Sequence, residues 1–291
     1  MEEDIETKRA TGRLVLATDL DGTMAGGTAE ARARLTRELA AHGATTLIYV
    51  TGRTPEAART LLAEAALPEP EVLVADVGSS VLRGAGPTRI TEIEAALSAG
   101  WPGARAVRER LAPLIGTELT PQDVDAPRRV SYWIEPVRRR RDRGGDDAFA
   151  ALAPDDAAFG EEAAVLADEV ARRARARLED MSVDILVSAN VFLDVLPRGV
   201  NKGTTLRRVL DWLGASDDDC VVAGDSLNDL ALFETGFRGI LVGNCEPGLR
   251  GRVGRSAGVY QARGHGAAGL LEGLRHHGHL GNGRAGGGRG E

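Results

Sequence analysis

The chain has 291 residues, of which 43% are hydrophobic and 27% charged, and its formal net charge is −7. This length and apolar content suffice for a buried core and two domains, and the acidic balance argues against nucleic acid as a partner. The apolar runs are too short to span a bilayer, and the acidic start of the chain lacks the basic and apolar regions of a signal peptide. We therefore expect a cytoplasmic protein that binds no membrane; the composition does not predict its oligomeric state.

The first predicted element is the apolar run Leu14–Thr18, which is typical of a buried parallel strand and leads into Asp19-Leu-Asp-Gly-Thr. Asp19 and Asp21 are two residues apart, so their side chains share one side of an extended chain, and Gly22 lets the backbone turn beside a ligand. The arrangement supplies a nucleophile and a neighbouring acid or base. The alternative is a plain turn, because Asp, Gly and Thr commonly follow strands.

Two further strands follow along the chain. Residues 47–50 lead into Thr51-Gly52-Arg53, where the Thr51 hydroxyl and free backbone N–H groups could hold phosphate oxygens before the next helix begins at Pro55. Residues 71–75 form the next predicted strand, which runs into Asp76-Val-Gly-Ser-Ser. Taken alone, Thr-Gly-Arg is a weak signal and equally fits an ordinary loop.

An insert of about residues 112–189 then occupies more chain than one crossover needs. Residues 129–134 and 183–187 are predicted strands, and an Ala-rich helix spans 155–178 with acidic residues early and arginines late. The insert is therefore a small α/β unit. We expect its hinges near residues 111–118 and 188–199, where Pro and Gly punctuate the chain, and a solvated loop at the arginine-rich run 138–143.

The last motifs are Lys202, at the start of an amphipathic segment, and Gly224-Asp-Ser-Leu-Asn-Asp, which follows the predicted strand 220–223. Ligands of open α/β sheets bind at the carboxyl ends of the strands, so the acidic clusters should meet there. Carboxylates so close together repel one another unless a cation neutralises them, and oxygen ligands suit Mg²⁺ rather than zinc or copper. The sequence therefore predicts an Mg²⁺ phosphoryl-transfer site.

In this order and spacing, the four segments resemble the motifs of the haloacid dehalogenase (HAD) phosphatase superfamily. The resemblance implies an α/β fold with a Rossmann-like, doubly wound parallel sheet as core and an inserted α/β cap. It also implies that Asp19 is the nucleophile and Asp21 the acid and base. The implied Mg²⁺ ligands are Asp19, the backbone carbonyl of Asp21, Asp225 and the nearby Asp229; the implied phosphate-binding residues are Thr51, Gly52, Lys202 and Asn228.

The insert resembles the cap of HAD subfamily IIB, and over residues 12–277 the chain is similar to sucrose-phosphate phosphatases and related sugar phosphatases. The likeness rests on four segments: 75–80, 129–132, 192–197 and 264–273. It implies that substrate hydroxyls are recognised by Asp76 and Ser79 from the core and by Arg129, Tyr132 and Asn190 from the cap. The predicted division is core 1–111, cap 112–189, core 190–277 and a flexible tail 278–291.

The predicted function is an Mg²⁺-dependent phosphatase that hydrolyses a phosphorylated sugar, such as sucrose 6-phosphate or an amino-sugar phosphate, through an aspartyl phosphate. A sugar phosphomutase is the alternative, because the same core and cap occur in phosphomannomutases. That enzyme needs an additional basic cluster facing the site, which the sequence does not place. A noncatalytic sugar-phosphate sensor is the third reading, although it has no need of both Asp19 and Asp21.

Overall fold

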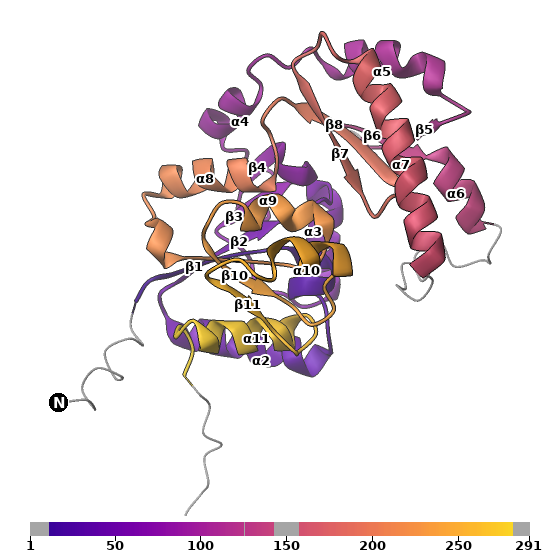
Figure 1. Cartoon of the computed structure of the whole chain (residues 1–291). Helices are drawn as coiled ribbons and strands as arrows, with labels where there is room; N and C mark the ends of the chain where they lie inside the picture. The colour runs from indigo at the N-terminus through magenta and orange to yellow at the C-terminus, as the bar shows by residue number, and fades with distance from the viewer. Residues whose placement is uncertain (1–11, 125, 143–156, 282–291) are drawn as a thin grey trace, which may run out of the picture.

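The computed structural model describes residues 12–124, 126–142 and 157–281, which form two α/β units (Figure 1). The core unit is built on a seven-stranded sheet in the order β11-β10-β9-β1-β2-β3-β4. All neighbours pair in parallel except β3 and β4, which form an antiparallel hairpin. The strands are β1 (Leu14–Thr18), β2 (Thr45–Val50), β3 (Val72–Ala75), β4 (Ser80–Arg83), β9 (Cys220–Gly224), β10 (Arg238–Leu241) and β11 (Val259–Gln261).

Helices cover both faces of the core sheet, so the predicted doubly wound α/β core is confirmed. Because successive strand residues point to opposite faces, Leu14 and Leu16 pack on one side and Val15 and Ala17 on the other. The first side packs against α2 (Ala29–His42), α3 (Pro55–Glu64) and α11 (Ala267–His276). The second packs against α4 (Thr91–Leu97), α8 (Lys202–Leu213), α9 (Leu230–Phe233) and α10 (Pro247–Val253). Short turns complete the core: η2 (Leu20–Met24), η3 (Asp76–Gly78), η6 (Asp217–Asp219) and η7 (Leu227–Asp229).

The second unit, the cap, is an antiparallel sheet in the order β5-β6-β8-β7. One face of this sheet is apolar and packs against α5 and α7, which lie on its outer side in Figure 1. The opposite face carries the polar pair Ser131 and Asp194 and the aromatic pair Trp133 and Phe192, with Leu186 and Leu196 beside them. The elements are α5 (Ala104–Leu111), η4 (Ala112–Leu114), β5 (Leu119–Pro121), β6 (Val130–Ile134), α6 (Glu135–Asp142), α7 (Ala157–Arg177), β7 (Val183–Ser188) and β8 (Phe192–Pro197).

The cap extends beyond the predicted limits of 112 and 189 at both ends. Val107 and Leu111 of α5 lie in the cap's apolar cluster, and β8 pairs with both β6 and β7. Residues 111–118 thus belong to the cap, with Leu111 and Leu114 in its apolar cluster, and differ from the predicted hinge. The two connections are residues 98–103, between α4 of the core and α5 of the cap, and residues 198–201, between β8 of the cap and α8 of the core.

Two local predictions also differ from the structure. Residues 138–142 of the arginine-rich run belong to helix α6 rather than a loop, while residue 143 lies outside the described residues. In the predicted flexible tail, Leu280 packs into the core cluster, and residues 282–291 lie outside the described part of the chain. Within the described ranges, no helix is long and apolar enough to cross a membrane.

Candidate active site

The candidate active site lies where three neighbouring core strands end. β1 pairs in parallel with β2 on one side and β9 on the other. Asp19 follows β1, Thr51 follows β2 and Asp225 follows β9, so all three lie at carboxyl ends of strands. The sheet thereby brings motifs that are far apart in the sequence to one edge.

The start of helix α8 places Lys202 at this edge. The Asn201 side chain caps the helix by accepting a hydrogen bond from the backbone N–H of Thr204 at 2.9 Å. Gly203 allows α8 to approach α9 closely, because a Cβ at this position would lie 2.0 Å from the carbonyl oxygen of Ala231. A larger residue would push the start of α8, and Lys202 with it, away from α9.

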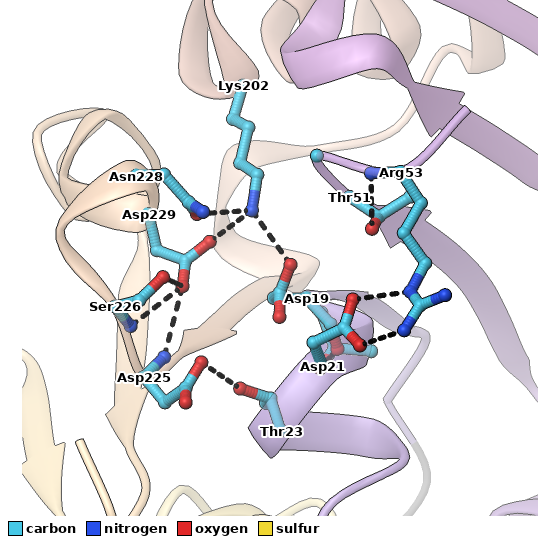
Figure 2. A network of polar contacts seen from close by, with 12 residues as sticks. Asp19, Asp21, Thr23, Thr51, Arg53, Lys202, Asp225, Ser226, Asn228 and Asp229 are labelled. Carbon is cyan, nitrogen blue, oxygen red and sulfur yellow. Dashed lines mark hydrogen bonds and ion pairs between the residues drawn. The ribbon is translucent and has the colours of Figure 1, made fainter. Parts of the chain in front are cut away.

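Lys202 supplies the positive charge at the centre of the site. Its side chain is buried, and Nζ donates to Oδ1 of Asp19 at 2.7 Å, Oδ1 of Asn228 at 2.7 Å and Oδ1 of Asp229 at 2.5 Å (Figure 2). Burial alone would lower the pKa of Lys202, but the two carboxylates outweigh it and raise the pKa. The lysine is therefore charged at neutral pH.

Three carboxylates surround this lysine. Oxygens of Asp19, Asp225 and Asp229 lie within 4.8 Å of one another. Burial, followed by the charge of the neighbouring carboxylates, raises the pKa of Asp225 to about 9. Burial likewise raises the pKa of Asp19 to about 7, against the opposing charge of Lys202. Oδ2 of Asp229 is fixed by the backbone N–H groups of Asp225 and Ser226, each at 3.1 Å.

This cluster fits a divalent cation. Three ionised carboxylates would exceed the single charge of the lysine and leave a net negative charge at a largely buried position, where it is costly unless a cation or protons neutralise it. All the donor atoms are oxygens, which is the ligand set that Mg²⁺ prefers. The side chain of Asp21 is not among the clustered carboxylates, so it adds no oxygen to this ligand set.

The pKa values of the cluster predict how stability depends on pH without metal. The folded protein binds protons more tightly on Asp225 than the unfolded chain does, over the range between the ordinary value of 3.8 and about 9. The free energy of unfolding should therefore fall as pH rises through this range, because the folded state holds more protons. Urea unfolding in EDTA measures the slope. Mg²⁺ or the variant Asp225→Asn should flatten it; a slope unchanged by either would contradict the prediction.

Gly22 lies so close to Asp225, a candidate metal ligand, that a side chain at this position would collide with it. Its φ is +69°, and a Cβ built there would lie 2.1 Å from Oδ2 of Asp225. Gly22→Ala should therefore displace Asp225 and weaken Mg²⁺ binding by about 10- to 100-fold, the usual effect of losing the support of a metal ligand. Calorimetric titration with Mg²⁺ measures this loss. The matched control is Gly43→Ala, because Gly43 has φ +72° with nothing within 4 Å of its Cβ position; equal loss of affinity in both variants would refute the steric explanation.

Asp21 points away from the lysine and toward Arg53. The Arg53 guanidinium donates from Nε to Oδ2 of Asp21 at 2.8 Å and from Nη2 to Oδ1 at 2.7 Å (Figure 2). The Asp21 side chain is 53% exposed, unlike the buried Asp19. Its extended backbone and the left-handed Gly22 produce this outward direction. Arg53 is a site residue that sequence reasoning left out of the predicted set, although it belongs to the Thr-Gly-Arg motif.

The core-side candidates and Arg129 come together at the boundary between cap and core. Arg129, just before β6, lies 2.9 Å from Oδ1 of the buried Asp76 and donates to the carbonyl oxygen of Gly52 at 2.7 Å. Ser79 is buried, and its hydroxyl donates to the carbonyl of Asp76 at 2.9 Å. Beside them, Arg128 donates to the carbonyl oxygen of Ser79 at 2.9 Å. Sequence analysis did not predict this second arginine.

Tyr132 and Asn190 lie elsewhere in the cap. Tyr132 shares the apolar face of the sheet with Val130 and Ile134 and is buried in the cap's own cluster, so its predicted role in substrate recognition is wrong. The alternation along β6 sends Ser131 and Trp133 to the other face instead. Asn190 lies in the turn between β7 and β8 with φ +56°. β7 contacts η7, which ends at Asp229, so this hairpin lies near the active site.

The chain matches a known protein family over most of its length. The sequence model described as Sucrose-6F-phosphate phosphohydrolase matches residues 12–141 and 161–278. The chain belongs to this family. The structure of the sucrose-phosphatase from Synechocystis sp., solved in complex with sucrose and phosphate, is 26% identical, covers 91% of this chain and 98% of that chain, and gives a TM-score of 0.72.

Two curated relatives extend the comparison. The mannosylfructose-phosphate phosphatase of Agrobacterium fabrum is 29% identical over 269 residues, covering 91% of this chain and 96% of that protein. The glucosylglycerol-phosphate synthase of Pseudomonas anguilliseptica is 36% identical over 268 residues, which are 92% of this chain but 31% of the synthase. The chain therefore spans less than a third of that relative. Together with the family match, the predicted HAD-superfamily sugar phosphatase, a phosphoric monoester hydrolase, is confirmed.

Proposed function

We propose that the chain hydrolyses the phosphate ester of a phosphorylated glycoside, with Mg²⁺ and through a phosphorylated Asp19. The observation that carries the proposal is the position of Asp19: it is buried, held by Lys202 at 2.7 Å, and clustered with Asp225 and Asp229. A carboxylate fixed in this way is directed and desolvated, as a nucleophile has to be. The cytoplasm remains our prediction for where it acts.

The chain's own residues can perform both chemical steps. An oxygen of Asp19 bonds to phosphorus while the bond from phosphorus to the sugar oxygen breaks, and Asp21 gives its proton to that oxygen. In the second step Asp21 takes a proton from water, whose oxygen bonds to phosphorus while the bond from phosphorus to the Asp19 oxygen breaks. This releases phosphate and restores the Asp19 carboxylate. Each oxygen of Asp21 now accepts one hydrogen bond from the Arg53 guanidinium, so we propose that Asp21 gives up at least one of these contacts when it carries the proton.

The remaining polar groups of the site would bind the phosphoryl oxygens and the metal ion and would transfer no proton. Lys202, Asn228 and the Thr51 hydroxyl are the groups we propose for the phosphoryl oxygens. Mg²⁺ would be held by Asp19 and Asp225 with the Asp21 carbonyl, beside Asp229, and when bound it would neutralise charge on the phosphoryl group. Phosphoryl transfer needs little else, since positioning and charge neutralisation supply most of its acceleration.

The polar face of the cap sheet supports a sugar as the leaving group. Ser131 and Asp194 are paired across β6 and β8, and the Ser131 hydroxyl donates to Asp194 at 2.5 Å. Trp133 and Phe192 are the next pair on the same face, with ring centroids 4.7 Å apart. Arg129, two residues before Ser131, contacts the core, so this face is directed toward the site. Carboxylate, hydroxyl and aromatic groups together suit hydroxyl-bearing rings.

The names of the two relatives point to glycosides that carry phosphate, and they define the test. Phosphate release is measured with Mg²⁺ on sucrose 6-phosphate, a mannosylfructose phosphate, a glucosylglycerol phosphate, an amino-sugar phosphate and a plain hexose phosphate. We expect kcat/KM for one glycoside phosphate to exceed that for the hexose phosphate by at least about 100-fold, because buried polar groups reject analogues that leave them unpaired. Equal kcat/KM values on all five esters would contradict the proposed substrate class. Interconversion of sugar phosphate isomers without phosphate release would indicate a mutase.

A further inference from the structure

Arg129 is the cap's contact with the phosphate-binding loop. Its side chain is only 6% exposed, yet it reaches across the boundary between the units. Nη1 donates to the carbonyl oxygen of Gly52 at 2.7 Å, and Nη2 lies 2.9 Å from Oδ1 of Asp76. Burial raises the pKa of Asp194 on β8 and the pKa of Asp76, and the positive charge of Arg129 opposes both shifts. Arg129 therefore interacts with one carboxylate in the cap and one in the core. A buried guanidinium held in this way has a fixed direction.

The contact at Gly52 reaches Thr51 through one rigid peptide. The C=O of Gly52 and the N–H of Arg53 belong to the same planar group and point in opposite directions. The C=O accepts from Arg129, and the N–H donates to Oγ1 of Thr51 at 3.1 Å. Because a hydroxyl that accepts one hydrogen bond still has its own proton to donate, this arrangement leaves the Thr51 O–H free to point at a phosphoryl oxygen.

A strained turn holds the loop from its other side. Asp76 donates its N–H to the carbonyl of Arg53 at 2.8 Å, and Val77 donates to the carbonyl of Thr51 at 3.1 Å. Both residues have positive φ, 53° and 58°, which is rare for a β-branched residue such as valine. Arg129 contacts Asp76 as well as Gly52, so the single guanidinium links this turn and the loop.

We propose that Arg129 is a positioning residue for phosphate binding, which acts when the cap rests on the core. By holding the Gly52 carbonyl it fixes the peptide that orients the Thr51 hydroxyl, so closure of the cap completes the phosphate site. The proposal rests on the proposed function, since it assumes that Thr51 binds phosphate. It replaces the predicted role of Arg129 in binding a sugar hydroxyl.

The variant Arg129→Lys tests this role. Lysine keeps the charge beside Asp76, but a single ammonium cannot reproduce the two-pronged contact with Gly52 and Asp76. Binding of inorganic phosphate in the presence of Mg²⁺, measured by calorimetry, should weaken about tenfold, the usual effect of losing a hydrogen bond to a charged group. Turnover of p-nitrophenyl phosphate, which has no sugar hydroxyl, should fall to a similar extent as turnover of the sugar phosphate.

The control is Arg128→Lys. Arg128 is also buried and also joins cap to core, through Glu94 at 2.9 Å and the Ser79 carbonyl, but it has no contact with residues 51–53 among its described interactions. Its variant should lower the unfolding temperature to a similar degree while leaving the Kd of phosphate within about twofold. If the two variants weaken phosphate binding equally, Arg129 serves only to dock the cap and the proposal fails.

A double-mutant cycle with Thr51→Val, which keeps the side-chain shape but removes the hydroxyl, tests the route of the effect. In that background Arg129→Lys should cause no further loss of phosphate affinity, because the two residues act on the same hydrogen bond. A full additional loss would overturn the proposal. A rise in KM for the sugar phosphate alone, with unchanged phosphate binding, would show direct sugar contact instead. Wild-type protein that neither binds phosphate nor hydrolyses any ester would refute the proposed function itself.

Discussion

Asp19→Asn is expected to abolish turnover, lowering kcat by about 10⁴-fold or more, the scale seen when a covalent nucleophile is removed. The amide keeps an oxygen for Lys202, which now donates to Oδ1 at 2.7 Å, so the fold should survive. The amide also removes one of three clustered carboxylates, whose repulsion helps to raise the pKa of Asp225 to about 9. Without metal, the variant should therefore unfold at a temperature no lower than that of the wild type.

Two measurements separate this result from a loss of folding. Initial rates with the best substrate give the change in kcat, and thermal unfolding in EDTA gives the change in stability. Asp218→Asn is the matched control, because Asp218 is an exposed acid in η6, outside the candidate site. We expect wild-type rates for this control. If the Asp19→Asn enzyme keeps more than about one hundredth of the wild-type kcat, Asp19 is not the nucleophile.

Lys202→Met is expected to have the largest effect on stability. The substitution keeps an unbranched buried side chain but leaves Asp19 and Asp229 without the cation that now lies 2.7 Å and 2.5 Å from them. Removing one partner of a buried ion pair costs about 3–5 kcal/mol, because the remaining charge is buried and unpaired. Mg²⁺ should restore part of this loss, whereas turnover should stay below detection, since the cation proposed for the phosphoryl group is gone.

Chemical unfolding with and without Mg²⁺ measures both parts of this expectation. Arg208→Met on the same helix is the control: it removes a positive charge from an exposed position, and it should change the free energy of unfolding by less than about 0.5 kcal/mol. If Lys202→Met is as stable as this control in EDTA, the lysine does not offset the buried negative charge of the clustered carboxylates.

The core of the site was predictable because its residues follow buried strands. The apolar runs before Asp19, Thr51 and Asp225 identify β1, β2 and β9, and strands of one parallel sheet end at a common edge. Their spacing in the sequence therefore has little influence on their distance in the fold. The direction of Asp21 was not predictable in the same way, because it depends on the backbone angles of one short turn and on Arg53.

The cap was predicted as a unit but not in its details, for two physical reasons. β8 is as apolar as a core strand, so only its pairing with β6 and β7 shows that it belongs to the cap. Tyr132 and Trp133 alternate on β6, and a shift of one residue would exchange their faces. The sequence offered no signal to choose between them. The contact of Arg129 with Gly52 likewise joins segments of two different units.

The most direct test of the central claim is to trap the phosphorylated enzyme. Asp21→Asn removes the base for the second step while leaving Asp19 and its contact with Lys202 in place. It also removes the acid for the first step, so the substrate is p-nitrophenyl phosphate, whose leaving group departs without a proton. After mixing with this ester and Mg²⁺ and quenching in acid, intact and peptide mass spectrometry should find one phosphoryl group on Asp19, and none in a protein that also carries Asp19→Asn. Release of phosphate by the wild type, with no phosphorylated Asp19 in any variant or time point, would contradict the account.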